Sequence, residues 1–217
     1  MKNFFNQHKI IFILYGSWFL ICLMLILIFG SVSISSWVNT NHNYFLDSFF
    51  KYITHLGDGI IALILIIILI LIRLDYGFHA IIGFSLSSSI TQFLKRVVFK
   101  DTMRPSVYFN DLIEQGSWHL IDGVQLHQLY SFPSGHTTSI FSVCVLLSLF
   151  TNSHKLKYSL SFIAILTGFS RIYLSQHFLV DVFVGSIIGF SAVIISYLIL
   201  NPRFSRFSKI SLLKYMK

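Results

Sequence analysis

Long apolar stretches dominate this sequence and leave few folds open to it. A transmembrane helix needs about 20 mostly apolar residues. Six stretches approach or reach that length: Ile10–Gly30, Gly59–Leu74, Phe78–Phe99, Ser134–Thr151, Tyr158–Leu174 and Phe178–Leu200. Only 11% of the 217 residues are charged, whereas soluble domains carry about 25%. We therefore expect one domain, residues 1–217, folded as an all-α bundle of six transmembrane helices.

The distribution of Lys and Arg predicts the orientation of this bundle. Short cytoplasmic loops of membrane proteins are enriched in basic residues. With the N-terminus inside, ten of the sixteen basic residues lie on the cytoplasmic side: Lys2, Lys9, Arg73, Lys155, Lys157, Arg203, Arg206, Lys209, Lys214 and Lys217. The only acid there is Asp75, and the other seven acids lie outside. We expect a protein of the cytoplasmic membrane with both termini in the cytoplasm.

The net charge of +8 therefore has a specific interpretation. The basic tail, residues 201–217, is first a topology signal, and contact with anionic lipids is a second role for it. Nucleic-acid binding is the weakest interpretation, and we expect no nucleic-acid partner. The sequence carries no information on oligomeric state.

Some residues outside the charged positions are expected to be structural. Cys22 and Cys144 lie within apolar runs and should be buried free thiols. Gly185 and Gly189 form a Gly-x-x-x-Gly pattern that predicts close helix packing. In the outer loop 31–58, the apolar residues are spaced as one face of a helix: Leu46, Phe49, Phe50 and Ile53. They predict either a short helix in the membrane interface or an ordinary amphipathic connector.

Polar residues gather in three blocks, which this topology places together. The blocks are Lys95-Arg96 with Arg104-Pro105, the run 131–137 (SFPSGHT), and Ser170-Arg171 with His177 and Asp181. Odd-numbered spans run outward and even-numbered spans inward, so all three blocks lie at the outer face. Ionisable groups close to membrane spans are costly. Their convergence therefore indicates a functional site.

These blocks resemble the signature of the type 2 phosphatidic acid phosphatase superfamily of lipid phosphatases, over residues 92–185. The second block, Pro133 to His136, and the third, with His177 and Asp181, fit the family pattern fully. The first block departs from it, since the family usually has six residues between its Lys and its Arg-Pro, whereas eight separate Lys95 from Arg104. A two-residue insertion in the turn would explain this. It leaves two choices for phosphate binding, Lys95, which we favour, and Arg96.

The residue types suit phosphoryl transfer, which spreads negative charge over three equatorial oxygens. Lys95, Arg104 and Arg171 would supply positive charge, and backbone N–H groups near Ser134 and Gly135 would point at the same oxygens.

His177 and Asp181 are four residues apart, on one face of a helix. Asp181 would orient the ring of His177 for attack on phosphorus. His136 would protonate the leaving oxygen and then activate water. These roles agree with those that the resemblance implies.

The resemblance implies hydrolysis of a phosphate monoester or diphosphate on a membrane lipid without a metal or other cofactor. The substrate alternatives are phosphatidate, phosphatidylglycerophosphate, undecaprenyl diphosphate and lipid A phosphate. A lipid-to-lipid phosphotransferase on the same scaffold and a non-enzymatic lipid-binding or transport protein are the functional alternatives. The chemical alternative is a hydrolytic zinc site at His136, His177 and Asp181, which the three nearby cations disfavour.

Overall fold

The computed structural model describes residues 2–204, and the regular structure of this part of the chain is entirely helical. This confirms the expected all-α class. The N-terminal half contains α1 (Lys2–Gln7), α2 (Lys9–Phe29), α3 (Ser31–Thr40), α4 (Tyr44–Ile53), the 3-10 turn η1 (Thr54–Gly57), α5 (Gly59–Ile72), α6 (Leu74–Phe93) and the π-turn η2 (Leu94–Val98). The rest contains α7 (Pro105–Tyr108), α8 (Asn110–Glu114), α9 (Gly135–Phe150), α10 (His154–Tyr173) and α11 (Leu179–Phe204). Residues 205–217, most of the basic tail, lie outside the described residues.

A helix occupies each of the six predicted apolar stretches, but the helices differ in their capacity to cross a membrane. By length and hydropathy, two helices of the described chain qualify, Lys9–Phe29 and Leu179–Leu200. A third qualifies if Tyr44–Gly57 and Gly59–Ile72, which are bent by 51° at Asp58, form one broken span. α9 has only 16 residues. The number of spans that meet this criterion is therefore two or three, not the predicted six.

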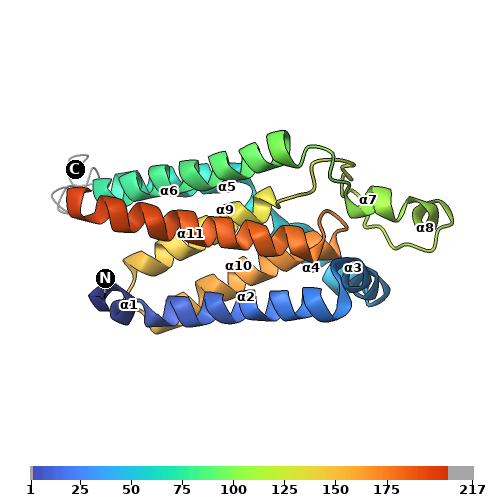
Figure 1. Ribbon diagram of the computed structural model, residues 1–217, viewed down its shortest axis with the longest axis horizontal. Coiled ribbons are helices and arrows are strands. Elements are labelled where there is room, and N and C mark those ends of the chain that lie inside the picture. Colours follow the sequence, from blue (N-terminus) through green and yellow to red (C-terminus); the bar gives the residue numbers. More distant parts are fainter. Residues whose placement is uncertain (1, 205–217) are drawn as a thin grey trace.

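The helices form an elongated bundle (Figure 1). The N-terminal helix α1 and the C-terminal end of α11 lie at one end of it, and α3, α4, α7 and α8 gather at the other. Many large apolar side chains on the bundle surface are exposed, such as Ile13 at 53%, Leu20 at 53% and Leu27 at 75% on α2. An apolar surface of this kind is typical of a face that contacts lipid or another protein.

Helix α9 lies at the centre of the bundle and packs against α6, α10 and α11. Two glycines permit its close approach to α11. A Cβ at Gly185 would lie 2.6 Å from the carbonyl oxygen of Ser134, and a Cβ at Gly189 would lie 2.6 Å from that of Thr138. The predicted packing role of this Gly-x-x-x-Gly pattern is thus confirmed, and the contact fixes the start of α9 against α11.

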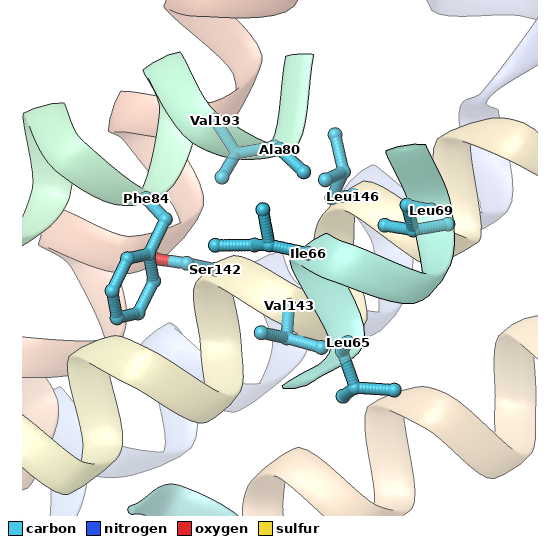
Figure 2. A pocket seen from close by; sticks show the side chains of 9 residues that line it. All are labelled: Leu65, Ile66, Leu69, Ala80, Phe84, Ser142, Val143, Leu146 and Val193. Atoms are coloured by element: carbon cyan, nitrogen blue, oxygen red, sulfur yellow. The ribbon is translucent and has the colours of Figure 1, made fainter. Parts of the chain in front are cut away.

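The middle of the bundle is filled by side chains. A pocket between α5, α6, α9 and α11 has a volume of only about 10 Å³ and is lined mainly by apolar residues, with Ile66 pointing into its centre (Figure 2). Such a volume admits at most one water molecule. Cys144 on α9 and Cys22 on α2 are both buried free thiols, as predicted. No lipid chain could enter this region without displacing core side chains.

The predicted amphipathic helix in the first outer loop is α4, but its apolar face contacts protein. Phe50 is 5% exposed and packs against Phe169 and Tyr173 of α10. Leu46, Phe49 and Ile53 join the same core cluster. This agrees with the amphipathic connector rather than with a helix whose predicted apolar face lies in the membrane.

Candidate active site

The three polar blocks meet at the end of the bundle that carries α3, α4, α7 and α8. The backbone N–H of Ser134 donates to the carbonyl oxygen of Asp181 at 3.0 Å, which joins the second block to the third. A guanidinium nitrogen of Arg104 lies 3.4 Å from Nε2 of His177, which joins the first block to the third. Residues more than 70 positions apart in the sequence therefore form one site.

Asp181 holds the imidazole of His177 in a defined orientation. Its Oδ2 lies 3.3 Å from Nδ1 of His177, and it also accepts hydrogen bonds from the backbone N–H of Phe178 at 3.0 Å and from Oγ of Ser131 at 2.5 Å. A carboxylate at Nδ1 favours the tautomer with its proton there. Nε2 of His177 then carries the lone pair and faces Arg104. The four-residue spacing predicted that His177 and Asp181 lie on one helix. Instead, His177 precedes α11, which begins at Leu179.

Burial and charge keep this imidazole neutral. His177 is 1% exposed, and desolvation lowers its pKa well below the usual value of about 6.5. The nearby positive charges of Arg104, Lys95 and Arg171 lower the pKa further, followed by His136. A neutral ring retains the lone pair that a nucleophile needs.

Backbone carbonyls fix the side chain of Arg104, which is 8% exposed. Its Nε donates to the carbonyl oxygen of Leu129 at 3.0 Å, and its Nη1 donates to that of Gln176 at 3.1 Å. Its backbone N–H also donates to the carbonyl oxygen of Gln128 at 2.9 Å. The guanidinium is thus held rigidly beside His177 by backbone carbonyls.

Lys95 and Arg96 point in different directions from the π-turn η2. Nζ of Lys95 donates to the carbonyl oxygen of Tyr130 at 2.8 Å, directly before the second block. Nε of Arg96 donates instead to Gln92 at 3.0 Å, on its own helix. π-Turns insert an extra residue into a helix and occur often at functional sites. This turn lies where the spacing from Lys95 to Arg104 departs from the family pattern.

Arg171, in the last turn of α10, is 6% exposed and is only partly hydrogen-bonded. Its Nη1 donates to Oγ1 of Thr54 at 2.7 Å, which ties the site to η1. Its buried Nε has no hydrogen-bond partner among the described residues. A buried donor without a partner costs about 1–3 kcal/mol, and an oxyanion bound at this position would satisfy it.

The start of α9 presents backbone donors to the same region. Ser134 is fully buried and caps the helix, because its Oγ accepts from the backbone N–H and the hydroxyl of Thr137. A Cβ at Gly135 would meet no described atom within 4 Å, so the backbone here borders open space. The N-terminus of a helix carries unpaired N–H groups and a partial positive charge. Both features favour an anion at this position.

His136 contacts a carboxylate that the sequence did not reveal. Its Nε2 lies 2.7 Å from Oδ1 of Asp58, a residue between η1 and α5. The second oxygen of Asp58 lies 2.9 Å from Nδ1 of His55. The two histidines of the predicted site, His136 and His177, therefore each pair with a different carboxylate.

A groove of about 670 Å³ opens beside His136 between α5, α6 and α9. Its lining is mixed, with Ile60 and Leu63 on α5 and Phe84, Ser88 and Gln92 on α6. No three His, Cys, Asp or Glu side chains within residues 2–204 are grouped as metal ligands. The groove thus combines the polar groups of Asp58 and His136 with an apolar flank.

Sequence reasoning named eight side chains or backbone groups that lie in or beside this site, and it missed four others. Ser131, Gln176, Thr54 and Asp58 contact the predicted residues but were assigned no role. Ser131 opens the second block and Gln176 precedes His177, so proximity in sequence was a usable signal for both. Thr54 and Asp58 carry no such signal because their loop contains no other predicted site residue.

Comparison with known proteins places this architecture in a family. The model of the PAP2 superfamily matches residues 74–205, more than half of the chain and all three polar blocks. The chain belongs to the PAP2 superfamily. This PAP2 protein is 30% identical over 171 residues to undecaprenyl-diphosphatase BcrC of Bacillus subtilis (strain 168), which covers 78% of each chain.

Two solved structures are similar in fold. LpxE of Aquifex aeolicus superposes with a TM-score of 0.67 at 29% identity, covering 77% of this chain and 94% of that one. The PAP2 type phosphatidylglycerolphosphate phosphatase of Bacillus subtilis superposes with a TM-score of 0.57 at 20% identity, covering 92% and 98%. This PAP2 protein is an integral membrane lipid phosphatase.

Proposed function

We propose that this protein removes the terminal phosphate of a lipid diphosphate through a phosphohistidine on His177, without a metal. The observation that carries the proposal is the orientation of His177. Asp181 contacts its Nδ1, and its Nε2 faces the guanidinium of Arg104. A neutral, oriented imidazole beside fixed positive charge is suited to attack a bound phosphoryl group.

The three cationic side chains and the start of α9 would bind the phosphate. Arg104 and Arg171 each offer several N–H donors to phosphate oxygens, and Lys95 adds a compact charge. The unpaired Nε of buried Arg171 supports this assignment. The backbone N–H groups at Gly135 and His136 complete the set of donors.

The reaction proceeds in two steps. In the first, Nε2 of His177 forms a bond to phosphorus, the bond from phosphorus to the bridging oxygen breaks, and His136 gives a proton to that oxygen. In the second, water attacks phosphorus, the N–P bond breaks, and His136 takes the proton of the water. Asp181 stabilises the positive charge that develops on His177 in the first step. Proton transfer of this kind contributes about 10²–10⁴-fold to rate.

The substrate we propose is a polyprenyl diphosphate of the undecaprenyl class. The similarity to undecaprenyl-diphosphatase BcrC, at 30% identity, supports this choice. The phosphatidylglycerolphosphate phosphatase of Bacillus subtilis, which is named for another lipid, is only 20% identical. The groove beside His136 has apolar residues on α5 and α6 and lies next to the group assigned to the leaving oxygen. It suits the prenyl chain of the leaving lipid phosphate.

We further propose that the protein crosses the cytoplasmic membrane six times, with its active site outside. The six longest helices occupy the six apolar stretches of the sequence. The site lies at the end of the bundle opposite α1, and the predicted cytoplasmic side, termini included, carries ten of the sixteen basic residues.

Phosphate release from purified protein tests the proposed function. The protein in detergent is given undecaprenyl diphosphate, phosphatidate and phosphatidylglycerophosphate, each with excess chelator. We expect chelator-resistant release, fastest from the diphosphate, and its loss in His177→Ala and Arg171→Ala. Release that disappears with chelator would support a metal site instead. Release only after addition of a lipid alcohol would support a phosphotransferase.

A further inference from the structure

Asp58 lies where the chain turns sharply between two helical segments. The segment Tyr44–Gly57 and helix α5 are bent by 51°, and Asp58 is the single residue between them. The turn passes very close to the start of α9, because a Cβ at Gly57 would lie 2.9 Å from the carbonyl oxygen of His136. The backbone geometry therefore places the carboxylate of Asp58 against His136.

The usual role of an Asp at this position is helix capping, and Asp58 does not perform it. It occupies the N-cap of α5, where Asp normally accepts a hydrogen bond from a backbone N–H of the first turn. The side chain of Asp58 makes no such bond. Its two oxygens contact imidazoles instead, His136 at 2.7 Å and His55 at 2.9 Å. Because Asp58 forgoes the stabilisation that a capping bond provides, its contact with His136 calls for another explanation.

We propose that Asp58 is the positioning residue of His136, as Asp181 is of His177. This rests on the proposed function, in which His136 transfers protons. Because Asp58 accepts at Nε2, the neutral ring of His136 carries its proton there and its lone pair on Nδ1. When the ring takes up a second proton, that proton lies on Nδ1, which gives it to the leaving oxygen. The ring is then neutral again, and its Nδ1 takes a proton from water.

Two opposed carboxylate–imidazole pairs thus serve the two sides of the phosphorus atom. Nδ1 of His177 is held by Asp181, which leaves Nε2 for attack. Nε2 of His136 is held by Asp58, which leaves Nδ1 for the leaving group. The same η1 segment also orients the phosphate-binding side, because Thr54 accepts from Arg171 at 2.7 Å.

The tautomer of His136 can be measured without any substrate. Nitrogen-15 spectra of histidine-labelled protein in detergent, with His136 assigned by comparison with His136→Gln, report which ring nitrogen is protonated. We expect the Nε2–H form in the wild type and a mixture of tautomers in Asp58→Asn. A wild-type ring protonated on Nδ1, or a spectrum unchanged by Asp58→Asn, would overturn the proposal. This readout holds even if the protein releases no phosphate.

A double-mutant cycle on phosphate release tests whether Asp58 acts through His136. In the wild-type background, Asp58→Asn should lower kcat about tenfold or more and change KM less than about threefold. In the His136→Ala background, the same substitution should change kcat less than about twofold.

Asp47→Asn is the matched control, because Asp47 forms a similar pair with His119 at 2.9 Å away from the predicted catalytic residues. It should leave kcat within about twofold of the wild type. Losses that multiply in the double variant would contradict a role through His136. A wild type that releases no phosphate while the spectra shift as expected would refute the proposed function and leave the positioning of His136 supported.

Discussion

A single oxygen of Asp181 organises the proposed nucleophile. Oδ2 accepts hydrogen bonds from the hydroxyl of Ser131 and the N–H of Phe178 and contacts the imidazole of His177. Rotation of the carboxylate would therefore break three contacts at once. Such networks are rigid because each bond restrains the others. The precision of the site at the residue scale therefore depends on Ser131 as well as on the two residues that the sequence pattern indicates.

Lys95 and Arg96 provide a matched pair for testing phosphate binding. Lys95 reaches the backbone of the second block, whereas Arg96 turns back to Gln92. We expect Lys95→Ala to lower kcat/KM for lipid phosphate about 10–100-fold through loss of a charge-assisted contact. Arg96→Ala should change it less than about threefold. Steady-state kinetics in detergent measure both, and a larger loss in Arg96→Ala would reverse the assignment.

Because His177 is buried in its neutral form, we predict that the free energy of unfolding decreases at acidic pH. Its pKa in the folded protein is below the unfolded value of about 6.5, so the unfolded chain binds more protons as pH falls. The contribution of this group to stability is therefore present above the unfolded pKa of about 6.5 and is lost as pH falls below it.

Thermal unfolding at pH 7.5 and pH 5.5 measures the effect. The variant His177→Gln, which cannot take up a proton, should lose less of its unfolding temperature between the two pH values than the wild type. An equal loss in both proteins would show that the titration of His177 does not contribute.

At the scale of elements, the helices were predictable and the contact at Asp58 was not. A helix such as Leu179–Leu200 is recognised by the length of its apolar run, which is a local property of the sequence. The pairing of Asp58 with His136 depends on a 51° bend and on the approach of Gly57 to α9, neither of which a sequence pattern encodes. The apolar face of α4 was recognised, yet periodicity does not distinguish packing on α10 from contact with lipid.

The packing of α11 on α9 should control activity as well as stability. A Cβ at Gly185 would clash with the carbonyl oxygen of Ser134, and relief of the clash would displace the start of α9 together with His136. We expect Gly185→Ala to lower the free energy of unfolding by about 1–3 kcal/mol and to lower kcat. Gly16→Ala on α2 is the control, since a Cβ there meets no described atom within 4 Å. Normal activity in Gly185→Ala would contradict this account of the close contact.

For the whole molecule, the bundle separates a cationic site at one end from α1 and the C-terminal end of α11 at the other. The exposed apolar residues along α2 fit a body surrounded by lipid. Length and hydropathy alone qualify two or three helices as spans. The six-span topology therefore needs an experiment of its own.

Accessibility of single cysteines tests that topology. In a background with Cys22 and Cys144 replaced by Ser, one cysteine is placed at Glu114 in α8 and, in a second protein, one at Ser153 before α10. An impermeant maleimide applied to intact cells, or to spheroplasts where an outer membrane is present, should label the first and not the second. Labelling of Ser153→Cys alone would place the site inside.

The phosphorylated intermediate is the most direct test of the mechanism. Purified protein is mixed with a polyprenyl diphosphate and excess chelator, quenched with alkali, which preserves phosphohistidine, and digested for mass spectrometry. We predict phosphate on His177 within the first turnover, and none in His177→Asn. Phosphate on another residue, or turnover that leaves no phosphate on the protein and stops with chelator, would contradict nucleophilic catalysis by His177.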